Sequence, residues 1–194
     1  MILHSCVDLS KDKDYTNYLS YFGDSLTSHF PLNTDDFDKY SYSIDTVAYS
    51  NTEDFSLTLI GTKKLIKEEK LKYKHKKIYA IEDNCIVIVN DFINKSSLLM
   101  DLNNGIHKSK LSPNCKESPI VIPNFWSNTL SKGQSKLNQD FKYIIIDLKH
   151  GETVYSSKIN PYKSYMPSVV KHGYSKGIAF NEKEEIIIYW LVIW

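Results

Sequence analysis

Residues 186–194 read Ile-Ile-Ile-Tyr-Trp-Leu-Val-Ile-Trp, an apolar run with almost no polar alternation. A strand of this composition must be covered on both faces, so it belongs in the middle of a sheet. The run is far shorter than the roughly 20 residues that a membrane-spanning helix needs. It therefore predicts a central, fully buried β-strand.

Apolar, β-branched runs separated by short polar turns recur along the chain, a pattern typical of β-hairpins. Alternating residues predict two further strands, over 40–49, with a bulge between Ile44 and Val47, and over 55–59. Three hairpins are expected: residues 78–81 with 85–89, 143–148 with 153–158, and 178–180 with 186–194.

The clearest helical signal lies near the start of the chain. Apolar residues at steps of three and four form one stripe between residues 14 and 30. Asp12 or Asp14 can cap the first amides, and Pro31 stops the helix. Gly23 lies off the stripe and weakens the helix. This stripe is expected to dock on the sheet.

Together these elements predict an α+β fold. A mainly antiparallel sheet is built from hairpins, the N-terminal amphipathic helix packs on it, and the C-terminal strand is central. The 194 residues fit a single domain over 14–194, preceded by a tether over residues 1–13. The scarcity of Ala, with only three, argues against a long helical bundle.

The first residues suggest an anchor. Leu3, Ser5 and Cys6 resemble the lipobox that ends a bacterial lipoprotein signal peptide, although His4 is a poor fit and most of the signal peptide is missing. The resemblance implies lipid on Cys6 and a cell-envelope location, which we favour over the cytoplasm. The other reading is a frayed N-terminus with a chance cysteine. If Cys6 is lipidated, Cys85 and Cys115 form an even pair for a disulfide; the alternative is that Cys85 is a small core residue in a strand.

Charge is distributed unevenly. Residues 1–62 carry ten acids and three lysines, whereas residues 63–116 carry twelve lysines and six acids. Residues 63–77 are the most basic stretch, and they suit either a short helix capped by Thr62 or an edge strand with lysines on one face. The stretch is the candidate binding surface for a protein or envelope component, through Lys63, Lys64, Lys67, Lys70 and Tyr73.

All basic residues are Lys, and the chain contains no Arg. Without guanidinium groups there is no bidentate reading of phosphate or guanine. The net charge of +1 and the interrupting Glu68 and Glu69 also argue against nucleic acid as the partner.

No motif for a metal or cofactor occurs, because no two histidines have ligand spacing and no CxxC is present. Residues 172–177 read as a small polar loop that supplies imidazole, phenol and hydroxyl groups. Asp147 or Glu152 could orient an imidazole. The alternative function is therefore a small hydrolase that uses His150, His172, Tyr174 and Ser175.

The lack of a catalytic motif favours a non-enzymatic role. We expect a binding or interaction protein, either a bacterial cell-envelope lipoprotein or an immunity-type inhibitor that neutralises a partner through a charged surface. The membrane is involved only through the lipid anchor. The sequence leaves the identity of the partner and the oligomeric state open.

Overall fold

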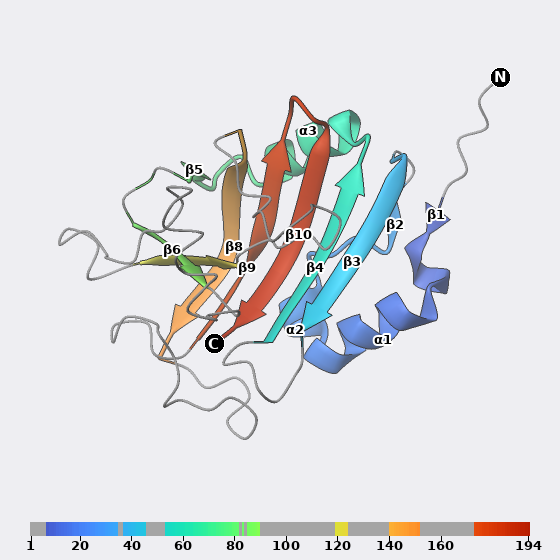
Figure 1. Cartoon of the computed structure of the whole chain (residues 1–194), viewed down its shortest axis with the longest axis horizontal. Helices are drawn as coiled ribbons and strands as arrows, with labels where there is room; N and C mark the ends of the chain where they lie inside the picture. Colours follow the sequence, from blue (N-terminus) through green and yellow to red (C-terminus); the bar gives the residue numbers. More distant parts are fainter. Residues whose placement is uncertain are drawn as a thin grey trace, which may run out of the picture.

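The structure is a computed structural model that describes residues 7–34, 37–45, 53–81, 83, 85–89, 119–123, 140–151 and 173–194. Its core is a six-stranded antiparallel sheet in the order β3-β4-β10-β9-β8-β5 (Figure 1). The strands are β3 (Lys39–Asp45), β4 (Glu53–Ile60), β5 (Ile78–Ala80), β8 (Lys142–His150), β9 (Gly173–Asn181) and β10 (Ile186–Ile193). The predicted α+β fold is confirmed, and the apolar run forms the central strand β10.

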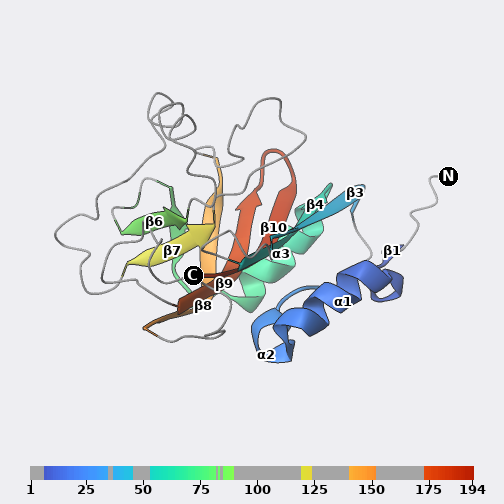
Figure 2. The same ribbon diagram turned by 60° about the horizontal axis from the view of Figure 1, so that its bottom comes forward.

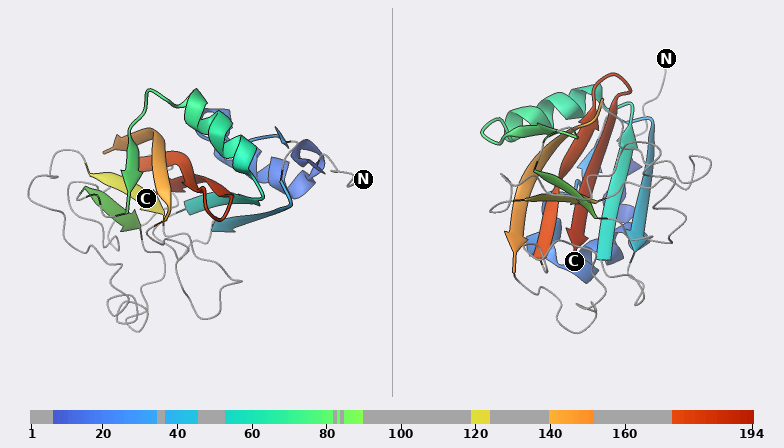
Figure 3. Two further views of the ribbon diagram at one scale, coloured as in Figure 1. Left: turned by 90° about the horizontal axis from the view of Figure 1, so that it is seen from above. Right: turned by 60° about the vertical axis from the view of Figure 1, so that its left-hand side comes forward.

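Alternation along β10 divides the core in two. Ile187, Tyr189, Leu191 and Ile193 pack on the face that carries the helices. Ile188, Trp190, Val192 and Trp194 face the other way, toward a two-stranded parallel sheet of β6 (Ile86–Val89) and β7 (Ile120–Pro123). The two layers lie on opposite sides of the main sheet (Figure 3). Both faces of β10 are buried, as its composition requires.

The N-terminal helix packs on the sheet as expected, but it is interrupted. Helix α1 (Lys13–Phe22) begins at Asp12, whose side chain accepts hydrogen bonds from the amides of Asp14 and Tyr15. It ends at Gly23, whose positive φ of 82° is a conformation that glycine adopts readily. The four-residue α2 (Asp24–Thr27) follows, so the predicted helix over 14–30 becomes two pieces lying together on one face (Figure 2).

The described part of the domain starts earlier than residue 14. Strand β1 (Val7–Asp8) pairs with β2 (Asn33–Thr34), and the 3-10 helix η1 (Leu9–Lys11) follows it. Leu9 is fully buried in the helix-side core. Residues 1–6 of the expected tether lie outside the described residues, but residues from Val7 onward belong to the fold.

Of the two alternatives left open for residues 63–77, the helix is the one that forms, as α3 (Lys63–Lys72). Two other expectations from the sequence are wrong. The turn at Asp83 exists, with its carboxylate accepting from the amide of Ala80 at 2.8 Å. However, β5 pairs with β8 and β6 pairs in parallel with β7, so residues 78–89 form no hairpin. Residues 173–177 are the first half of β9 and not a loop.

Two other expectations fall outside the described residues: the strand over 153–158 and the bulge between Ile44 and Val47. The hairpin between β9 and β10 is confirmed, and its register pairs Asn181 with Ile186. A bulge does occur in β8, between Ile145 and Asp147.

Two glycines in β9 make room for two tryptophans of β10. Gly177 lies opposite Trp190, and a Cβ on Gly177 would sit 2.6 Å from the Trp190 ring and 2.3 Å from the carbonyl oxygen of Ile144. A Cβ on Gly173 would sit 3.0 Å from the Trp194 ring and 2.0 Å from the carbonyl oxygen of Lys149. The indoles therefore lie across the neighbouring strand, where any larger residue would displace them.

We predict that Gly177→Ala lowers the free energy of unfolding by about 1–3 kcal/mol, because the added methyl group overpacks a site bounded by backbone and an indole. Ser175→Ala, two residues away on the same face, is the matched control. Its hydroxyl is buried and has no partner in the described part of the chain, so its removal should be close to neutral. Urea denaturation of both variants tests this, and equal midpoints would contradict it.

Candidate functional site

Helix α3 carries the candidate binding residues and is tied to the sheet at its start. Thr62, which is fully buried, donates from both its amide and its hydroxyl to the carbonyl oxygen of Glu185, at 3.0 and 2.9 Å. Ile66 is buried, and Leu65 and Tyr73 pack against the helix-side core. The apolar side of α3 thus faces the sheet, and its lysines are turned outward.

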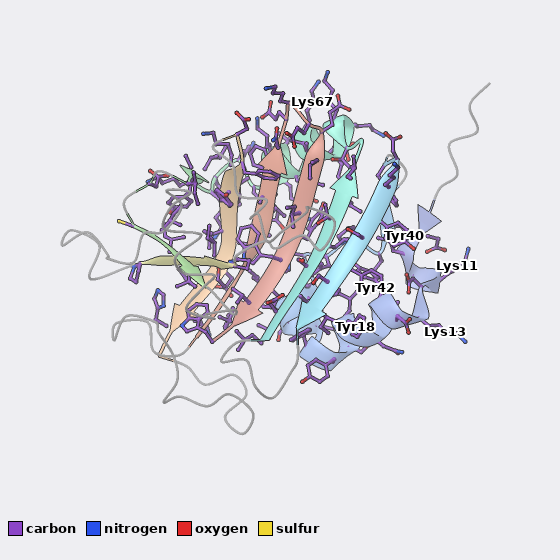
Figure 4. The ribbon with its side chains drawn as sticks, viewed as in Figure 1. Lys11, Lys13, Tyr18, Tyr40, Tyr42 and Lys67 are labelled. Carbon is purple, nitrogen blue, oxygen red and sulfur yellow. The ribbon has the colours of Figure 1, made fainter. Side chains whose placement is uncertain are left out.

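The outer side of α3 presents Lys63, Lys64 and Lys67, all exposed, which we call the basic face. Figure 4 places Lys67 at the upper rim of the molecule, near the ends of the strands. The Lys63 ammonium is 4.0 Å from the Glu185 carboxylate, a weak and solvent-exposed pair. Lys74, His75, Lys76 and Lys77 extend the exposed basic surface beyond the helix.

The two other candidate binding residues have a structural role. Lys70 forms an ion pair with Glu182, and its ammonium lies 5.5 Å from the centroid of the Phe180 ring. Tyr73 is half-buried, and burial raises the pKa of its phenol. Lys70 and Tyr73 therefore hold α3 on the sheet, whereas Lys63, Lys64 and Lys67 lie on its exposed side.

The structure separates the residues of the hydrolase alternative. Successive residues of a strand point to opposite faces. Tyr174 accordingly lies in the helix-side core, whereas Ser175 is on the face of β6 and β7. His172 and Glu152 lie outside the described residues. A site that combines the Tyr174 phenol with the Ser175 hydroxyl is therefore ruled out.

His150 shares a face with Ser175, but its contacts are structural. Its Nε2 is 2.9 Å from the carbonyl oxygen of Pro119, and its ring lies 6.0 Å from the Trp194 ring. Asp147 does not orient it, because Asp147 accepts hydrogen bonds from the Tyr174 hydroxyl at 2.6 Å and the Leu148 amide at 2.9 Å. No hydrogen bond joins His150 to Ser175 in the described part of the structure.

A polar corner on the helix side escaped the sequence analysis. The bulge in β8 pairs Asp147 with Lys176, so both side chains face the helices. Lys176 is 7% exposed and donates to the carbonyl oxygen of Ser25 at 2.5 Å, which ties α2 to the sheet. Burial lowers the pKa of Lys176, while the charge of Asp147 acts in the opposite direction. A lysine at an inward position of β9 was the available signal, hidden because residues 172–177 read as a loop.

His29 is the other buried ionisable group that joins helix and sheet. It follows α2, is 5% exposed, and its Nε2 donates to the carbonyl oxygen of Trp190 at 2.9 Å. Burial lowers the pKa of His29 to about 3, although the hydrogen bond to Trp190 acts in the opposite direction. The imidazole is therefore neutral in the folded protein and protonates with a pKa near 6.5 in the unfolded chain.

We predict that acid destabilises the fold through His29. Because the folded-state pKa is the lower one, protons favour the unfolded chain, and stability present above pH 6.5 is lost as the pH falls toward 3. The loss between pH 7 and pH 4 should be about 3 kcal/mol. His29→Gln keeps a donor but removes the titration, so its stability should fall less over this range. Parallel stability curves for the two proteins would show that His29 is not responsible.

Cys85 is disulfide-bonded, and the cysteine that pairs with it lies outside the described residues. Cys85 also packs against the core on the side of β6 and β7. In the described ranges, no group of three His, Cys, Asp or Glu side chains is placed to hold a metal ion. No helix there is both long and apolar enough to cross a membrane.

In comparisons with known proteins, no family model, curated protein or solved structure matches the chain.

Proposed function

We propose that the protein is a non-enzymatic interaction protein that recognises an acidic surface on a partner protein through the basic face of α3. The observation that carries this proposal is the arrangement of α3 itself. Its inner side is fixed by Thr62, Ile66 and Tyr73, and its outer side presents exposed lysines. A positive surface of this kind speeds association with an acidic partner, and salt weakens that effect.

The proposal includes an attachment to the cell envelope through Cys6. Two features support it: the lipobox-like Leu3, Ser5 and Cys6, and the disulfide of Cys85. Disulfides persist mainly in oxidising compartments outside the cytoplasm. An immunity-type inhibitor at the cell surface is the specific form of this function that fits both the anchor and the basic face.

We predict that K63E/K67E weakens binding to poly-L-glutamate, used as a defined acidic probe, by about tenfold at low salt. K11E/K13E is the matched control, because it reverses two exposed lysines on the other side of the molecule. Fluorescence anisotropy over a salt series measures both variants. Equal weakening by the two variants, or binding that ignores salt, would overturn the assignment to α3. Tighter binding to a short DNA duplex than to poly-L-glutamate would point to nucleic acid.

A separate prediction concerns the anchor. Purified from its native cells, the protein should begin at Cys6 and carry diacylglycerol on that residue, which intact-mass and peptide mass spectrometry can detect. A native N-terminal peptide that contains His4 together with an unmodified Cys6 would exclude the lipid anchor. That result would leave the basic face untouched.

A further inference from the structure

Strand β3 forms one border of the main sheet and is long and regular for a border strand. All seven of its residues pair with β4 without a register shift. No described strand pairs with its outer edge, which Figure 1 shows at the side of the sheet. Unpaired amides and carbonyls along such an edge are a template for another strand.

The opposite border is built differently. Strand β5 has only three residues and pairs with the start of β8. Beyond it, the Lys76 ammonium donates to the carbonyl oxygen of Ile146 at 3.1 Å, and Lys77 lies over the Tyr79 ring. A short strand and nearby lysines protect this border against strand addition. The β3 border is longer, and α1 packs against the tyrosine face of β3, but no strand pairs with its backbone edge in the described ranges.

When two copies of β3 pair antiparallel, their residues are complementary. Antiparallel pairing centred on Tyr42 would put Lys39 opposite the partner's Asp45 and Ser41 opposite the partner's Ser43. Opposite charges and aromatic pairs placed across antiparallel strands are stabilising. A parallel arrangement would instead bring Lys39 beside the partner's Lys39.

Contacts with α1 also hold the tyrosine side chains of β3 in place before any partner binds. The hydroxyls of Tyr40 and Tyr42 lie 3.3 and 3.4 Å from the two carboxylate oxygens of Asp12, the residue that caps α1. The Tyr42 ring packs against Tyr18 at a centroid distance of 5.8 Å. Figure 4 shows these tyrosines gathered between β3 and α1. Because the rings are held before association, little side-chain entropy is lost when a partner binds.

We propose that a second copy of this chain pairs with the β3 border, antiparallel and about a two-fold axis through Tyr42, to form one continuous sheet across the dimer. A two-fold interface uses the same surface on both protomers, which matches the self-complementary sequence of β3. Because β3 has only seven residues, we expect a small interface and a weak dimer that forms at roughly micromolar concentrations or above.

The test is a charge exchange followed by sedimentation velocity over a concentration series. D45K alone replaces two attractive cross-strand pairs by two repulsive ones, and should weaken dimerisation by about tenfold. K39D alone should do the same. K39D/D45K exchanges the charges and should restore the dimer. Far-UV circular dichroism and thermal melting check that each variant remains folded.

Three results would overturn this proposal: a monomer at every concentration, a dimer that D45K and K39D do not weaken, or a double variant as weak as the single variants. Strand addition by a different protein at β3 would appear as the first of these. K63E/K67E is the control, because it removes the basic face of α3 and should dimerise normally. The self-association proposal and the proposed function can therefore fail independently.

Discussion

Two indole rings that cross two glycines fix the register of the central strand pair. Glycines at 173 and 177 and tryptophans at 190 and 194 share a spacing of four, so each indole finds a residue without a side chain opposite. A slip of two residues would place the Trp190 indole against Ala179 or Ser175 instead. β10 also pairs along its whole length with β4, so it joins both halves of the sheet.

The sequence was informative where one physical requirement dominates. An apolar run with no polar face could only be central, and the aromatic stripe of residues 14–30 could only dock on the core. Where requirements compete, the sequence left alternatives open. Residues 63–77 alternate well enough for a strand, but Leu65, Ile66 and Tyr73 also fit one side of a helix, and tertiary packing decided between them.

Strand β9 was hidden by its glycines and polar residues. Gly, Ser and Lys normally indicate a loop, but the glycines and the lysine of β9 have specific partners in the fold. Gly173 and Gly177 receive indoles, and Lys176 reaches the carbonyl oxygen of Ser25. The indoles lie on the next strand, whereas Ser25 lies on α2, far away in the sequence. The parallel pairing of β6 with β7 was missed for a similar cause, because residues 86–89 and 120–123 meet only in three dimensions.

The charge asymmetry of the sequence is partly neutralised within the fold. Lysines of α3 pair with Glu182 and Glu185 of the turn between β9 and β10, rather than with the acidic N-terminal residues. The acids near α1 have their own partners: Asp8 pairs with Lys11, and Asp12 caps the helix and holds two tyrosines. The molecule therefore keeps two chemically distinct sides, one basic at α3 and one rich in tyrosine at β3.

The position of β10 in chain order also bears on how the protein is made. It follows every other described strand in the sequence, yet it lies between β4 and β9 and joins them. During synthesis, β3 with β4 and β8 with β9 can form only separate ribbons with exposed apolar faces, because the strand that unites them is translated after both. The nascent chain therefore stays unfolded until late in synthesis, and an unfolded chain can still be threaded through a narrow channel. Folding should be slow, because its decisive contacts are distant in sequence.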